Sequence, residues 1–168
     1  MSNQAFIDGQ NLFRGTSTST PSWKIDLNRF RKYLERKYDV SEAYYFMGVV
    51  DDSQTEMYND IQRAGFILIF RSHNPLMMTA KKGNVDTDLV FTVMRNLYKK
   101  DLKGKVILVS GDGDYFKMVS FLIDECKFEK VLFPAKNKAS SLYKSLAPQY
   151  FDFLDSKSIK EKIAYKRR

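Results

Sequence analysis

The sequence has very few of the residues that many catalytic sites require. Its 168 residues include one cysteine, Cys126, and one histidine, His73. A single cysteine excludes an internal disulfide and a cysteine-ligated metal site, and a single histidine excludes an acid–base mechanism that uses two histidines of one chain. Cys126 follows a helical pattern of apolar residues and is expected in the core. The chain contains neither a Gly-Xaa-Ser-Xaa-Gly elbow nor a phosphate-binding P-loop.

Long hydrophobic runs are also absent. No apolar stretch is long enough to span a membrane, and the first residues lack the basic and apolar regions of a signal peptide. We therefore expect no membrane partner and a cytoplasmic location. The hydrophobic fraction of 43% and the aromatic fraction of 14% are sufficient for the core of one domain.

Positive charge is in excess. The net charge is +8, and the segment 157–168 holds six basic side chains and one acidic side chain, which leaves +3 for the rest of the chain. A basic tail can contact a phosphate backbone, and it can equally be a solvated end that aids solubility. The chain has 13 Phe and 10 Tyr. Exposed aromatic side chains among them would mark a dimer surface, so a homodimer stays an open alternative.

Apolar runs alternate with stretches of helical period. Strands are expected at 4–8, 43–49, 66–70, 105–109 and 130–133, with a short last strand near 150–153. Helices are expected at 26–38, 53–64, 86–99, 114–125 and 140–146. This alternation predicts a three-layer α/β/α, Rossmann-like fold with a mostly parallel central sheet. Gly9 would allow a tight turn after the first strand, residues 16–22 form a polar loop, and 155–168 is a peripheral helix or a tail.

Aspartates follow the apolar runs. Asp8 ends the first strand, Asp112 and Asp114 follow 106–109, and Asp86 and Asp88 open a helix. Ligands of parallel sheets bind at the carboxyl ends of the strands, so these side chains are expected at one edge. Carboxylates raise each other's pKa when they meet, and a divalent cation such as Mg²⁺ or Mn²⁺ relieves that repulsion.

Each aspartate also has a structural alternative. Asp8 can form an Asx-turn with the residues before Asn11, and Asp114 can cap the helix that it begins. Capping leaves Asp112 without an explanation, which favours a metal role for the pair. Side chains two apart on a helix point in different directions, so we expect Asp86 to face the site and Asp88 to play a supporting role.

Three motifs resemble those of a known family. Residues 6–11, 82–89 and 108–115, with a fourth stretch from 140 to 154, resemble the motifs of NYN-domain proteins of the LabA-like group, within the PIN-like nuclease superfamily. The resemblance implies a PIN-like domain over 1–154, followed by a basic tail or helix at 155–168. It implies metal-dependent ribonuclease activity with an acidic site made by Asp8, Asp86, Asp112 and Asp114.

The resemblance extends to neighbouring polar residues and has one departure. Asn11 matches the asparagine of the first motif, and Ser110 matches the serine that precedes the third. Thr92 stands where the family often has another aspartate. Asp88, four residues earlier on the same helix face, can partly substitute for it, and the number of metals stays open.

These residues predict hydrolysis of RNA phosphodiester bonds, in single-stranded or structured RNA. The four aspartates would hold Mg²⁺ or Mn²⁺, and Asp112 or Asp114 would orient or deprotonate the attacking water. Asn11 would position Asp8 or the phosphate, while Lys81, Lys82 and Lys136 would contact the backbone. A non-catalytic RNA-binding or regulatory module and a DNA nuclease remain alternatives. A phosphatase is disfavoured because Gln10 occupies the place of its second aspartate.

Overall fold

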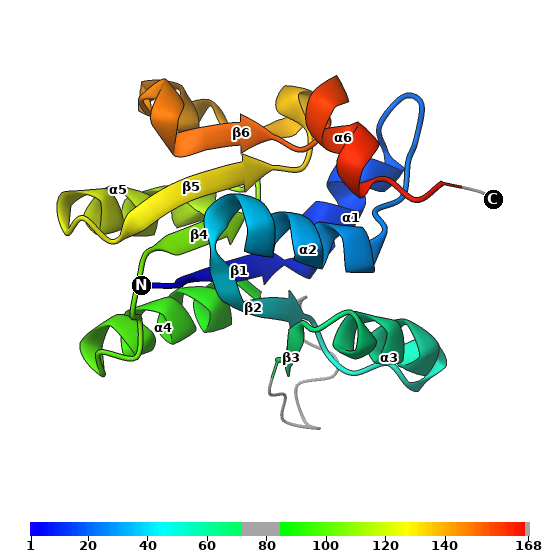
Figure 1. The fold of residues 1–168 in the computed structure, drawn as a ribbon, viewed down its shortest axis with the longest axis horizontal. Helices are drawn as coiled ribbons and strands as arrows, with labels where there is room; N and C mark the ends of the chain where they lie inside the picture. The colour runs from blue at the N-terminus through cyan, green and yellow to red at the C-terminus, as the bar shows by residue number, and fades with distance from the viewer. Residues whose placement is uncertain (72–84, 167–168) are drawn as a thin grey trace, which may run out of the picture.

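The computed structural model describes residues 1–71 and 85–166. Within them, a parallel sheet of six strands forms the middle layer, in the order β3-β2-β1-β4-β5-β6 (Figure 1). The strands are β1 (Asn3–Asp8), β2 (Val40–Met47), β3 (Ile67–Phe70), β4 (Val106–Val109), β5 (Phe128–Phe133) and β6 (Phe151–Phe153). The predicted three-layer α/β/α fold is confirmed, and every strand pair is parallel.

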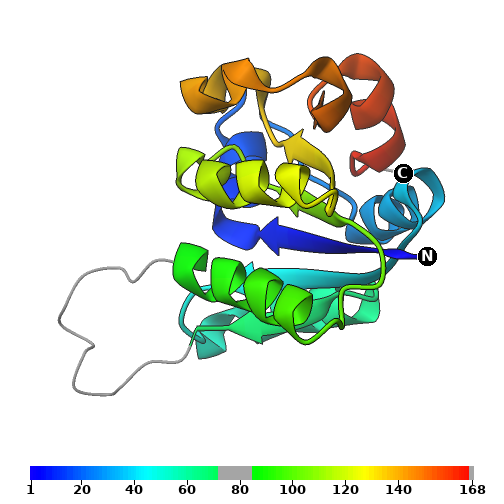
Figure 2. The ribbon, with the colours of Figure 1, turned by 90° about the vertical axis from the view of Figure 1, so that its left-hand side faces the viewer.

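Helices cover both faces of the sheet. Helices α1 (Gly9–Ser17), α2 (Leu27–Tyr38), α3 (Thr55–Arg63) and α6 (Lys157–Ile163) contribute to one core cluster. Helices α4 (Val85–Tyr98) and α5 (Phe116–Asp124) contribute to the other, and Figure 2 shows these two together on one face. Five 3₁₀ turns complete the described chain: η1 (Asp52–Gln54), η3 (Gly113–Tyr115), η4 (Lys136–Lys138), η5 (Ser141–Ser145) and η6 (Pro148–Tyr150).

Local sequence signals account for most of these elements. All four residues of β4 are apolar and buried, as expected for a central strand that is covered on both faces. In α2, Asp26 caps the first turn by accepting a hydrogen bond from the Arg29 amide, and Phe30, Leu34 and Tyr38 recur at helical spacing on the buried side.

The segment after β1 differs from the prediction. Instead of a tight turn and loop, Asp8 caps a nine-residue helix, α1, whose first residue is Gly9. A Cβ on Gly9 would lie 2.6 Å from Tyr45 Cε1 and 2.7 Å from the Phe46 carbonyl oxygen. Gly9 is therefore required by the close approach of α1 to β2 rather than by a turn, which the sequence pattern alone does not reveal.

Two further predictions are wrong in detail. Residues 140–146 were expected to form an α-helix, and the structure has the 3₁₀ turn η5 there. Cys126 was expected in the core, but it is exposed with φ = 57°, in the turn that follows α5. The apolar period of α5 ends before this residue, so it does not share the buried face of the helix.

The segment 155–166 contains a packed helix. The side chains of Ile159 and Ile163 on α6 are buried in the cluster that also contains α2. The Asp26 amide donates to the Ile163 carbonyl at 2.8 Å and joins the two helices through the backbone. Among the described helices, none combines the length and apolar character needed to cross a membrane.

Candidate functional site

The candidate site lies between β1 and β4, where the strand order of the sheet reverses. From β1 the chain passes to β2 on one side, whereas β4, the other neighbour of β1, leads on to β5. Ligands of open parallel sheets bind at such a switch point, outside the carboxyl ends of the strands. Asp8 is the last residue of β1, and the segment 110–114 follows β4 directly. Figure 2 shows the arrowhead of β1 and the first turn of α4 at the same end of the molecule.

Three carboxylates converge at this edge. Asp8, Asp86 and Asp112 each offer an oxygen atom, and these atoms lie within 4.8 Å of one another. They come from three separate elements: the end of β1, the first turn of α4 and the segment after β4. Asp8 is buried, with 4% of its surface exposed, and the other two are half-buried. Oxygen ligands at this spacing suit a hard divalent cation.

A tyrosine that the sequence analysis did not single out bridges two of these carboxylates. The Tyr115 hydroxyl lies 3.0 Å from Asp8 Oδ2 and 3.0 Å from Asp86 Oδ1, and its side chain is fully buried. A phenol has one proton, so it can serve both carboxylates only by sharing that proton. In the sequence, Tyr115 was counted only as part of the helix expected at 114–125. The available signal was a polar aromatic residue directly after two aspartates.

The electrostatics of the cluster favour a cation. Burial raises the pKa of Asp8, and the Asp112 charge adds to this, while hydrogen bonds from the Asn11 amide and Tyr115 oppose it. Burial also raises the pKa of Asp86, with the charges of Asp112, Asp8 and Asp114 in the same direction. Burial likewise raises the pKa of Tyr115, so the phenol stays protonated and donates. A bound cation would offset both effects on the carboxylates.

Asn11 links the segment after β4 to the end of β1, and Ser110 stabilises that segment from within. The Asn11 side-chain oxygen accepts a hydrogen bond from the Gly111 amide at 2.8 Å, while its own amide donates to Asp8 Oδ1 at 3.1 Å. The buried Ser110 hydroxyl accepts from the Asp112 amide at 3.1 Å. Asn11 therefore connects the segments that hold two of the three carboxylates.

The capping roles of the aspartate pair are the reverse of those expected. Asp112 caps η3 by accepting from the Asp114 amide at 3.0 Å, and Asp114 lies inside that turn. The Tyr143 hydroxyl donates to the Asp112 carbonyl at 2.6 Å. A Cβ on Gly113 would lie 2.5 Å from Ser140 Oγ, so η3 and the residues around η5 pack too closely for a side chain there. Hydrogen bonds with Asn11 of α1 and Tyr143 of η5 therefore hold the segment 110–114 in place.

Comparison with known proteins identifies the family. The model of the NYN domain matches residues 4–155, nearly the whole chain. The chain belongs to the NYN-domain family. This places the protein in a nuclease-type superfamily of PIN-like fold, and its buried acidic cluster offers a place for a metal ion.

A solved structure supports the fold of this NYN domain. A crystal structure of a protein of unknown function from Vibrio parahaemolyticus RIMD 2210633 is 19% identical, with a TM-score of 0.72 over 98% of this chain and 96% of the other. At this identity the likeness concerns the fold alone. A comparison with curated proteins finds no match.

The two other aspartates singled out in the sequence of this NYN domain, Asp114 and Asp88, lie outside the group of three carboxylates. Asp114 is exposed, and its charge contributes to the raised pKa of Asp86. Asp88 is half-buried on α4. The hydroxyl of Thr92, which is buried, donates to the backbone carbonyl of Asp88 at 2.7 Å. Thr92 thus makes a hydrogen bond within its own helix.

Of the three lysines predicted to contact a nucleic acid, Lys136 lies within the described residues. Lys136 follows β5, is exposed, and has its ammonium group 5.6 Å from the centre of the Phe153 ring. Its amide donates to Asp155 Oδ2 at 3.0 Å, which holds the backbone at this edge of the sheet. Lys81 and Lys82 lie outside the described residues, as does His73.

Proposed function

We propose that this NYN domain is a metal-dependent ribonuclease that hydrolyses RNA phosphodiester bonds. The observation that carries the proposal is the convergence of Asp8, Asp86 and Asp112 at the switch point of the sheet. Three carboxylates at this spacing, one buried and two half-buried, are costly to ionise together without a cation. Their oxygen-only chemistry fits Mg²⁺ or Mn²⁺ better than softer metals.

The three aspartates would hold the metal, and their neighbours orient them. When bound, the cation would lower the pKa of a water molecule and stabilise the charge of the phosphoryl transition state. Tyr115 aligns Asp8 with Asp86 through its hydroxyl, and Asn11 holds Asp8 against the segment that leads to Asp112. These contacts fix the ligand oxygens before substrate arrives, which reduces the reorganisation needed for reaction.

Asp114 is the residue best placed to handle a proton. It lies two residues after Asp112, its side chain is exposed, and it is close enough to Asp86 to influence its pKa. In this role its carboxylate accepts a proton from the attacking water. The exposed Lys136, at the same edge of the sheet, would contact the phosphate backbone, as would Lys81 and Lys82.

Cleavage assays test the proposal directly. Wild-type protein is incubated with Mn²⁺ and matched RNA or DNA strands, single-stranded and structured, beside Asp112→Asn. An asparagine at 112 still accepts from the Asp114 amide, so η3 is retained while one anionic ligand is lost. As a control, Asp124→Asn removes an exposed carboxylate at the end of α5.

The expected result is RNA cleavage by the wild type and by the Asp124 variant, and its loss in the Asp112 variant. Equal cleavage by all three would indicate a contaminating nuclease and would overturn the proposal. Cleavage of DNA in preference to RNA would assign the site to DNA. Metal binding or RNA binding without any cleavage would favour the non-catalytic, regulatory alternative.

A further inference from the structure

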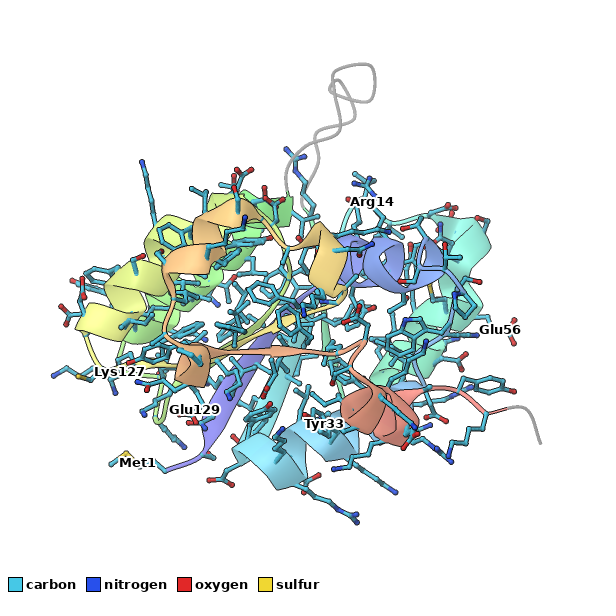
Figure 3. The ribbon with its side chains drawn as sticks, turned by 90° about the horizontal axis from the view of Figure 1, so that it is seen from above. Met1, Arg14, Tyr33, Glu56, Lys127 and Glu129 are labelled. Carbon is cyan, nitrogen blue, oxygen red and sulfur yellow. The ribbon has the colours of Figure 1, made fainter. Side chains whose placement is uncertain are left out.

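A basic groove lies between α2 and α6, in the layer opposite α4 and α5. It has a volume of about 400 Å³. The side chains that line it are Arg29, Lys32, Tyr33, Arg36 and Lys37 from α2 and Lys162 from α6. We call this feature the α2–α6 groove. Figure 3 shows Tyr33 beside α6, with α4 and α5 on the other side of the sheet.

The charge of the protein is concentrated in these two helices. Helix α2 has five basic residues and one acidic residue, and α6 has three basic residues and one acidic residue. Together they carry a net +6 of the chain's +8. Buried apolar side chains on the inner face hold the helices together, including Phe30, Leu34 and Ile163. The cations are therefore presented outward by a rigid pair of helices.

Three of the five cations in the α2–α6 groove remain available to a ligand. Lys37 lies 3.6 Å from Asp152 and 5.5 Å from the centre of the Tyr33 ring, and Arg29 lies 3.8 Å from Asp26. In contrast, Lys32, Arg36 and Lys162 are exposed and form no ion pair with any carboxylate in the described residues. These three residues can exchange their counterions for phosphate groups.

We propose that the α2–α6 groove binds the phosphate backbone of an RNA strand, at a site distinct from the acidic cluster. The acidic cluster lies at the carboxyl edge of the sheet, where Asp8 ends β1 and Asp86 lies in the first turn of α4, and it shares no residue with the lining of the groove. An arginine fork such as that of Arg36 suits phosphate oxygens, and three unpaired cations along one surface match a repeating anion. The inference does not depend on cleavage, since it concerns binding alone.

The surrounding surface favours a nucleic acid over a membrane. Basic helices that bind lipid surfaces also insert apolar side chains. None of the exposed large hydrophobic residues of the described chain lies on α2 or α6; Tyr165 comes two residues after the end of α6, with the Lys24 ammonium 5.7 Å from its ring centre. The groove thus provides charge without an apolar anchor.

The salt dependence of RNA binding tests the groove. Fluorescence anisotropy of a labelled single-stranded RNA is measured in EDTA, which prevents metal-dependent cleavage, across a range of monovalent salt. The variant combines Lys32→Gln, Arg36→Gln and Lys162→Gln. The control combines Lys99→Gln, Lys103→Gln and Lys127→Gln, in the segments that join α4 to β4 and α5 to β5. It removes the same charge outside the groove.

For single strands, each neutralised phosphate contributes roughly 0.7 to the slope of log K against log salt. Losing three contacts therefore lowers the slope of the groove variant by about 2 and its affinity on the order of 100-fold at 0.1 M salt. The control keeps a slope close to that of the wild type. All six positions are on the surface or partly exposed, so the variants are expected to unfold at the wild-type temperature.

Two outcomes would overturn the inference. One is an equal slope for the groove variant and the control. The other is binding of the wild type to vesicles that contain phosphatidylserine but not to RNA. The result also stays separate from the proposed function. Groove-dependent binding without any cleavage overturns only the nuclease proposal, and cleavage with an unchanged slope overturns only the groove.

Discussion

Replacing Tyr115 by phenylalanine tests the reading of the acidic site most directly. The substitution keeps the ring and removes one buried oxygen, whose proton serves Asp8 and Asp86 at 3.0 Å each. Without metal, both carboxylates then lose a donor that opposes the effect of burial on their pKa. Because the hydroxyl has one proton, it contributes about one full hydrogen bond to a charged group.

Such a bond contributes about 2 kcal/mol to the free energy of unfolding. For a chain of this length, 1 kcal/mol corresponds to a change of roughly 2–4 °C in melting temperature. The Tyr115→Phe variant is therefore expected to melt about 4–8 °C below the wild type in metal-free buffer at neutral pH. Saturation with Mn²⁺ should reduce this difference, because the cation then neutralises the same carboxylates.

The stability deficit of the Tyr115→Phe variant is expected to depend on pH. The pKa values of Asp8 and Asp86 are already raised from 3.8, and loss of the phenol donor raises them further. A donor to a carboxylate stabilises only its ionised form. The stability deficit of the variant is therefore fully present above these raised pKa values and is lost as the pH falls through them towards 3.8.

Thermal unfolding followed by circular dichroism between pH 3.5 and about 8, with EDTA or Mn²⁺, measures all of this. Tyr45→Phe is the matched control, since Tyr45 is buried and its hydroxyl makes no hydrogen bond with any described residue. It should change stability by less than about 0.5 kcal/mol. A Tyr115 deficit that equals this control, or that is constant across the pH range, would show that the Tyr115 hydroxyl does not stabilise the ionised carboxylates of Asp8 and Asp86.

Three further substitutions test the rest of the site. Asp8→Asn should raise the metal-free melting temperature at neutral pH, because it removes a carboxylate whose raised pKa makes its charge unfavourable in the fold. It should also abolish the gain of about 2.7 kcal/mol expected for the wild type at Mn²⁺ a hundredfold above the dissociation constant; an unchanged gain would exclude Asp8 as a ligand. Asn11→Ala leaves the Gly111 amide without its acceptor and should cost about 1–3 kcal/mol in denaturant unfolding. Gly113→Ala should cost a similar amount, about 1–3 kcal/mol, since its new methyl group would press on Ser140, and wild-type stability would show that this contact is loose.

Features of the fold that depend on short segments of the sequence were predictable, whereas features that depend on contacts between distant residues were not. The apolar strands and the period of α2 are properties of short segments, and they predicted the layers and most element positions. Helix α1 was missed because its first residues read as an Asx-turn, and Gly9 as a turn glycine. The glycine is required by contacts with Tyr45 and Phe46, about 36 residues away in the sequence. Such a requirement leaves no local pattern.

The candidate site shows the same division. The aspartates at strand ends predicted a site at the carboxyl edge of the sheet, because the carboxyl ends of parallel strands meet at one edge. The pattern did not predict that Asp112, rather than Asp114, caps the turn, or that the buried hydroxyl of Tyr115 lies between two carboxylates. Those facts depend on how α4, β1 and η3 pack against one another.

Short segments of the sequence are enough to predict the α/β/α class, the family and the candidate aspartates, because strand and helix periods and short motifs are encoded within a few residues. Which of these carboxylates meet depends on the packing of the whole fold. Asp8, Asp86 and Asp112 lie within 4.8 Å because three elements from distant parts of the chain converge at one switch point. The structure likewise joined the cations of α2 and α6 in one groove, since packing of their apolar faces aligns charges more than a hundred residues apart in the chain.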